Sequence, residues 1–120
     1  MKLIKSFKYA WNGIKSCFIS EPNFRIHSFL TIVILIFSIF LNISAMEWIA
    51  VGVCIAFVLA MEMINTAIEK LCNVVHKDVH PGIKKVKDIA AGAVLVSAIF
   101  SLITGLIIFL PKIIMYFKSF

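Results

Sequence analysis

The sequence predicts an all-α membrane protein, with an N-terminal amphipathic helix on the membrane surface followed by three transmembrane helices. Two observations support this fold class. Hydrophobic residues make up 62% of the chain and charged residues 15%, far from the averages of soluble domains. Three long apolar stretches also follow one another, separated by short polar segments. A length of 120 residues fits a single domain over 1–120.

The surface helix is expected over about residues 3–19. Apolar residues recur there at helical spacing, and lysines occupy the rest of the helical wheel, where they can meet anionic lipid head groups. A helix that binds a partner protein is the alternative. The segment "SEPNF" then interrupts the helix, and Pro22 fits the first turn of the next one, with Ser20 or Glu21 as its cap. The apolar positions of the surface helix are Leu3, Phe7, Ala10, Trp11, Ile14 and Phe18.

The three transmembrane helices are expected over about residues 26–46, 48–69 and 89–111. The first stretch has no charged residue, and its 21 residues extend roughly 30 Å as a helix, enough to cross a bilayer. The second is interrupted only near its end, by Glu62, Asn65 and Glu69. The third carries no charge.

The distribution of basic residues predicts the orientation in the membrane. The segment before the first span and the loop over 70–88 are both basic, whereas the turn between the first two spans has no lysine or arginine. The positive-inside rule therefore places the N-terminus and this loop in the cytoplasm and the C-terminus outside. Lys112 and Lys118 weakly oppose this assignment.

Four polar residues in and just after the second apolar segment fall on one face of a helix. At about 100° per residue they lie within a stripe roughly 80° wide, and Glu62 and Glu69 are about 10 Å apart along the axis. A charged side chain deep in a bilayer costs about 2.5–3.5 kcal/mol or more, so a metal, a partner charge, water or protonation must offset it. The stripe consists of Glu62, Asn65, Glu69 and Asn73.

The positions of these acids suggest different chemical roles for the two carboxylates. A carboxylate near the membrane surface suits Mg²⁺, which prefers one or two carboxylates plus phosphate oxygens. A deeper carboxylate suits a general base, and the lysines of the loop can contact phosphate. The pattern indicates phosphoryl transfer to a membrane-embedded alcohol. Helix packing and a proton or ion conduit are the alternatives, but a conduit requires neither Glu21 nor the Lys87–Asp88 pair.

Several motifs together resemble the small bacterial diacylglycerol kinase and undecaprenol kinase family. They are "EMINTAIEK", then "KVKDIAAGAVL" after a short hydrophilic loop, and the upstream "KYAWNGI" and "SEPNFRIH". The resemblance extends from about Leu3 to Phe109. It implies a surface helix and three transmembrane helices, a homotrimer with active sites between subunits, and ATP and Mg²⁺ as co-substrate and cofactor. It implies no nucleic-acid partner.

The resemblance also implies roles for the polar stripe. Glu62 is expected to be the base that accepts the proton of the lipid hydroxyl, with Asn65 and Ala91 at the lipid substrate. Glu69 and Glu21 are expected to hold the Mg²⁺ that binds ATP.

Further residues are expected at the nucleotide. Lys87 is expected at the phosphates, and five others border the ATP: Tyr9, Asp78, Val79, His80 and Asp88.

Three positions depart from the better-studied diacylglycerol kinase branch. Lys2, expected at the substrate, replaces an arginine, Asn73 replaces an aspartate, and His27 replaces an acidic residue. The segments "NFRIH" and "HPGIKKVKDIAAGAVL" are more similar to the Gram-positive-type branch. That similarity favours undecaprenol over diacylglycerol as the acceptor.

Overall fold

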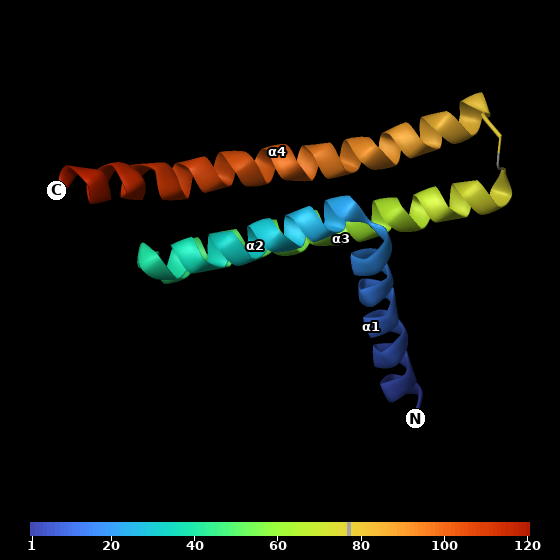
Figure 1. Cartoon of the computed structure of the whole chain (residues 1–120), viewed down its shortest axis with the longest axis horizontal. Coiled ribbons are helices and arrows are strands. Elements are labelled where there is room, and N and C mark those ends of the chain that lie inside the picture. The colour runs from blue at the N-terminus through green and yellow to red at the C-terminus, as the bar shows by residue number, and fades with distance from the viewer. Residues whose placement is uncertain (77) are drawn as a thin grey trace.

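The computed structural model describes residues 1–76 and 78–120 and confirms an all-helical chain (Figure 1). Three of its four helices are long and apolar enough to cross a membrane. The helices are α1 (Lys2–Ser20), α2 (Pro22–Phe40), α3 (Ala45–Val75) and α4 (Pro81–Lys118).

Helix α3 is the central element of the fold. It packs along α4 and, over a shorter length, against α2, whereas the backbones of α2 and α4 do not come close to each other. Helix α1 projects at a steep angle from the other three (Figure 1), and Cys17 is its one buried residue. Its location on a membrane surface stays a prediction.

The corner between α1 and α2 forms at the predicted place. Glu21 has extended backbone angles and Pro22 opens α2. Glu21 is the N-cap residue, but its side chain makes no capping hydrogen bond. Arg25 closes the corner instead, because its Nη1 donates to the carbonyls of Phe18 at 2.9 Å and Ile19 at 2.8 Å. These carbonyls lie in the last turn of α1, where helical partners are missing.

Helix α2 ends at Phe40, earlier than the apolar stretch suggests. Asn42 adopts a φ of 55°, in the left-handed region that asparagine tolerates better than most residues. The N–H of Asn42 then donates to the carbonyl of Ile39, and that of Ile43 to the carbonyl of Ser38. This pair of bonds is a Schellman motif, which ends a helix sharply despite apolar sequence on both sides.

Helix α3 starts directly after this turn. The N–H of Glu47 donates to the Ser44 hydroxyl at 3.2 Å, and the N–H of Ser44 donates to the Glu47 carboxylate at 2.9 Å. This capping box satisfies two of the free N–H groups at a helix start. Glu47 therefore has a structural role in addition to being a charge on the turn.

Helix α4 continues seven residues beyond Pro111, the expected end of the third span. Proline lacks the N–H for one helical bond, yet the next turns are anchored to the rest of the chain. Lys112 Nζ lies 3.1 Å from the Glu47 carboxylate, and the rings of Tyr116 and Phe40 meet edge to face at 5.4 Å. Tertiary contacts therefore hold the helix past the proline.

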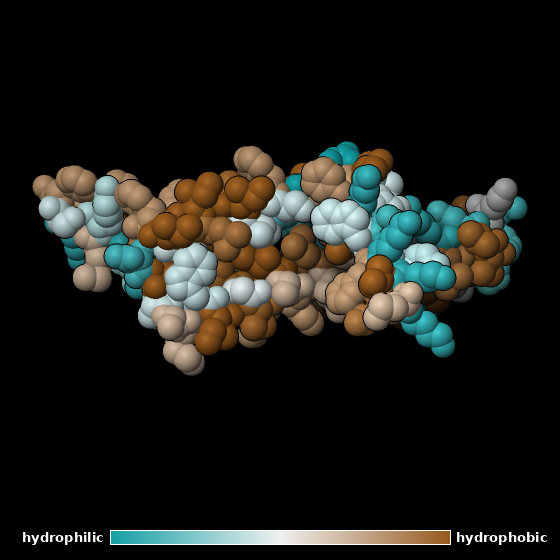
Figure 2. Space-filling model, turned by 90° about the horizontal axis from the view of Figure 1, so that it is seen from below, coloured by the Kyte–Doolittle hydropathy of each residue, from teal (hydrophilic) through white to brown (hydrophobic). Residues whose placement is uncertain are grey.

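The buried core of the chain lies at this same end. Ile43, Val51 and Ile108 form its centre, so the α2–α3 turn packs against α4. Hydrophobic side chains cover the middle of the helices, and hydrophilic ones gather toward the end where α3 stops and α4 begins (Figure 2). The predicted site residues lie mostly toward that hydrophilic end.

Candidate functional site

Glu62 is buried, with 6% of its surface exposed, although it lies within an apolar helix. Its carboxylate Oε1 is 3.2 Å from Nε2 of His27 on α2. Among the described residues, no other basic side chain lies within 4 Å of this carboxylate. A polar partner reduces the cost of burying a carboxylic acid in a membrane. In the part of the chain that the structure describes, His27 is the basic side chain that contacts Glu62.

Asn65 and Glu69 continue the polar stripe along α3. Asn65 Nδ2 lies at hydrogen-bond distance from Glu69 Oε1, at 3.4 Å. Asn65 Oδ1 is buried and has no partner within the described part of the chain. Buried polar oxygens are normally satisfied, so this atom is an exception among the described residues.

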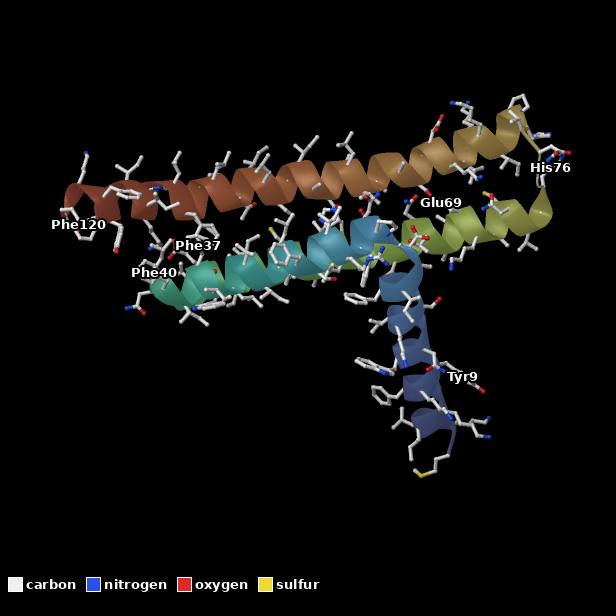
Figure 3. All side chains as sticks on the ribbon, viewed as in Figure 1. Tyr9, Phe37, Phe40, Glu69, His76 and Phe120 are labelled. Carbon is white, nitrogen blue, oxygen red and sulfur yellow. The ribbon has the colours of Figure 1, made fainter. Side chains whose placement is uncertain are left out.

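The α1–α2 corner lies at the level of Glu69 on α3. Lys70 Nζ donates to the hydroxyl of Ser20 at 3.3 Å, which places the neighbours of Glu69 and Glu21 in contact. Figure 3 shows Glu69 beside this corner. Among the described residues, neither Glu69 nor Glu21 has a basic partner within 4 Å. Two carboxylates without cationic partners fit a Mg²⁺ ion that takes its other ligands from phosphate and water.

The described residues hold no group of three or more His, Cys, Asp or Glu side chains suited to a metal ion. A site of two carboxylates completed by phosphate oxygens does not need such a group. The Mg²⁺ ligand set of Glu21 and Glu69 therefore stays a prediction.

A hollow of about 320 Å³ lies where α3 passes into α4. The residues around it combine two imidazoles, a carboxylate and two lysines, a set suited to a phosphate-bearing ligand. Four of them are predicted ATP-binding residues, namely Asp78, Val79, His80 and Lys87.

His80 also has a structural role at this hollow. Its Nδ1 accepts hydrogen bonds from the N–H groups of Gly82 at 3.0 Å and Ile83 at 3.4 Å, which caps α4. The cap fixes the imidazole, so that only Nε2 is left for a ligand.

Two lysines of the first turns of α4 have defined partners. Lys87 Nζ donates to Asn73 Oδ1 on α3 at 2.8 Å. Lys84 Nζ lies 2.8 Å from the carboxylate of Asp88, one helical turn away. Lys87 is thus held by the last member of the polar stripe, while Asp88 is exposed and paired within its own helix.

Replacing Asn73 by alanine is expected to raise the KM for Mg-ATP about three- to tenfold and leave kcat nearly unchanged. The reason is that Lys87 loses its hydrogen bond to Asn73, and a hydrogen bond that involves a charged group contributes about 1.5 kcal/mol of stabilising free energy. Steady-state kinetics with ATP varied at saturating lipid measure the effect. Asn12→Ala, which removes an exposed amide on α1, is the control. An unchanged KM would mean that Asn73 does not position Lys87.

Three predicted site residues lie apart from these groups within one chain. Tyr9 is 70% exposed on α1, and Lys2 is exposed at the start of the same helix (Figure 3). Ala91 is exposed on α4, whereas its neighbour Ala90 is buried. Their roles at the nucleotide and lipid stay predictions.

A largely apolar groove of about 390 Å³ crosses α3 between α2 and α4. It forms because the backbones of α2 and α4 both lie against α3 without coming close to each other. Its walls are mostly aliphatic and aromatic, and His27 lies at one end. Val58, one turn before Glu62, also lines it. The groove therefore ends beside the buried carboxylate.

Sequence reasoning left the roles of His27 and Asn73 open. Both side chains contact predicted functional residues on other helices, Glu62 and Lys87 respectively. A periodic pattern predicts which residues share a face of one helix, but not which face of a second helix meets it. A histidine early in an otherwise apolar span was the available signal for His27.

Comparisons with known proteins give the context for this site. Residues 8–109 match the sequence profile described as prokaryotic diacylglycerol kinase. The chain is 38% identical to undecaprenol kinase of Bacillus subtilis over 112 residues, covering 93% of this chain and 91% of that protein. It is 35% identical to a diacylglycerol kinase of Synechocystis, covering 92% of this chain and 64% of that protein. It is 25% identical to diacylglycerol kinase of Escherichia coli, covering 89% and 88% respectively.

Proposed function

The chain belongs to the prokaryotic diacylglycerol kinase family, and from this membership we propose that it transfers the γ-phosphate of ATP to the hydroxyl group of undecaprenol. Membership makes it a lipid kinase of the membrane. It also sets aside a non-enzymatic ion conduit.

The observation that carries the proposal is the position of Glu62. It is buried in a helix that can cross a membrane, one turn from the end of an apolar groove. A lipid whose chain lies in the groove would present its hydroxyl at this carboxylate. No soluble substrate requires an acid at such a place.

The reaction follows from that geometry. Glu62 accepts the proton of the lipid hydroxyl while the hydroxyl oxygen attacks the γ-phosphorus of ATP. The new O–P bond forms while the bond between the γ-phosphorus and the bridging oxygen breaks, and ADP leaves with that oxygen. Such a transfer depends mainly on positioning and on neutralising phosphate charge. Lys87 and Lys84 line the hollow at the start of α4, which lies roughly 20 Å along α3 from Glu62, so the part of the nucleotide remote from the γ-phosphate would bind there.

Glu21 and Glu69 would hold the metal ion. When bound, Mg²⁺ neutralises charge on the ATP phosphates and orients them. The two carboxylates are brought to one level of α3 by the Lys70–Ser20 contact, and they have no cationic partner in the described part of the chain. Both properties support this assignment.

We further propose that the protein is a homotrimer with its N-terminus and the 70–88 loop in the cytoplasm. The position of Tyr9 on α1, away from Glu69, supports active sites shared between subunits (Figure 3). The ion pair of Lys112 with Glu47 supports the orientation, because it neutralises a lysine that otherwise opposes the positive-inside rule.

Undecaprenol is preferred over diacylglycerol as the acceptor because a 38% identical relative bears the name undecaprenol kinase. The relatives from Synechocystis and Escherichia coli bear the name diacylglycerol kinase, so diacylglycerol is the alternative acceptor.

Transfer of labelled γ-phosphate from Mg-ATP, with both lipids offered side by side to the purified protein, tests the proposal. We expect undecaprenyl phosphate to be the main product. Mostly phosphatidic acid would assign the diacylglycerol activity instead. A folded protein that labels neither lipid would contradict both assignments.

A further inference from the structure

We propose that His27 is the positioning residue of Glu62, the group that holds the catalytic carboxylate in place for the acceptor hydroxyl. The inference rests on the proposed function and extends it to a residue outside the polar stripe of α3. Three features of the structure carry it, namely the contact itself, the state of the second carboxylate oxygen, and the place of His27 at the groove.

The contact occupies one oxygen of the carboxylate. His27 Nε2 lies 3.2 Å from Glu62 Oε1, and the two side chains come from different helices. A glutamate side chain has three rotatable bonds, so a carboxylate without a partner would sample several positions. A contact with a neighbouring helix restricts it to one of them.

The other carboxylate oxygen remains available for chemistry. Glu62 Oε2 makes no hydrogen bond with any residue that the structure describes. It is also not one of the fully buried polar atoms that lack a hydrogen-bond partner. It is thus accessible at the surface of the chain. A base held through one oxygen presents the other in a fixed direction, which is the arrangement that proton abstraction requires.

His27 also lies where the acceptor must pass. Its side chain is 27% exposed and lines the end of the apolar groove, while that of Glu62 is 7% exposed. A histidine that only joined two helices would be enclosed between them. This imidazole instead faces the space that leads to the carboxylate, next to the expected position of the hydroxyl.

Two amide substitutions of His27 separate the contact from general packing. Glutamine can bring a side-chain N–H₂ about as far as the imidazole Nε2, whereas asparagine ends about one atom short. His27→Asn is expected to lower kcat about 100-fold, as misplacement by about 1 Å can do, with an unchanged KM for Mg-ATP. His27→Gln is expected to stay within about tenfold of the parent.

Ser28→Ala is the matched control. Ser28 is the next residue of α2, and its hydroxyl donates to the carbonyl of Phe24 in its own helix, so it does not touch Glu62. Its kcat is expected to equal that of the parent. Equal kcat values for the glutamine and asparagine variants, whether high or low, would overturn the role of the Nε2 contact.

A double-substitution cycle tests whether His27 acts through Glu62. Glu62→Asp keeps a carboxylate but withdraws it from the histidine by one methylene group. His27→Asn should therefore cost much less than 100-fold in the Glu62→Asp background. The same loss in both backgrounds would show that His27 acts independently and would overturn the inference. A parent protein without lipid phosphorylation would instead contradict the proposed function, and so the two failures are distinguishable.

Discussion

Glu62→Gln is expected to reduce kcat for lipid phosphorylation by about 10²- to 10⁴-fold, the range that a positioned general base contributes. Glutamine has nearly the same shape as glutamate but cannot accept the hydroxyl proton. The substitution should not destabilise the fold, because Glu62 is buried and a neutral amide costs less free energy in a membrane than a carboxylate. Binding of Mg-ATP should therefore persist, and the variant should fold.

The measurement combines single-turnover phosphate transfer with equilibrium binding of Mg-ATP. Glu47→Gln is the matched control, since Glu47 lies in the first turn of the same helix and only caps it and pairs with Lys112. That control should turn over normally, with some loss of thermal stability. Activity near that of the parent in Glu62→Gln would remove Glu62 as the base.

The second large effect is expected at the metal site. Glu69→Gln and Glu21→Gln should each raise the Mg²⁺ concentration required for nucleotide binding on the order of 100-fold, because each removes a charged oxygen ligand. Part of the lost turnover should return at high Mg²⁺. Titration of Mg²⁺ against ATP binding reads this effect without relying on catalysis.

The pair of variants also tests whether both acids serve one ion. If both acids bind one ion, their effects are coupled, and the Mg²⁺ requirement of the double variant should depart from the product of the two single effects. Glu47→Gln again serves as the control and should titrate like the parent. If the Mg²⁺ requirement of both single variants matches that of the parent, the assignment of Glu21 and Glu69 is wrong.

The helical architecture could be predicted because apolar length and charge distribution act locally along the chain. The ends of the helices could not be predicted as well. Apolar sequence continues past Phe40, and the termination there depends on Asn42 adopting a left-handed conformation and on the Ser44–Glu47 capping box. Beyond Pro111, contacts made by Lys112 and Tyr116 outweigh the missing hydrogen bond. The first outcome depends on local backbone geometry and capping, and the second depends on tertiary contacts.

The polar stripe of α3 could be predicted from spacing alone, since its members share one helix. The contacts that complete the site could not. His27 meets Glu62, and Asn73 meets Lys87, across helix pairs whose relative rotation depends on packing of the whole chain. The roles expected for Tyr9, Lys2 and Ala91 stay predictions.

The groove between α2 and α4 opens sideways, between two helices that can each cross the bilayer. An acceptor lipid can then reach Glu62 by lateral diffusion, with its chain remaining among other lipid chains. Encounter becomes a two-dimensional process, governed by how many acceptor molecules share a given membrane area. The apparent KM for the acceptor should accordingly stay constant when it is expressed as a mole fraction of total lipid. When it is expressed as a bulk concentration, it should rise whenever inert lipid is added. Dilution of the acceptor with phospholipid would lower the rate even though the amount of acceptor in the tube stays the same.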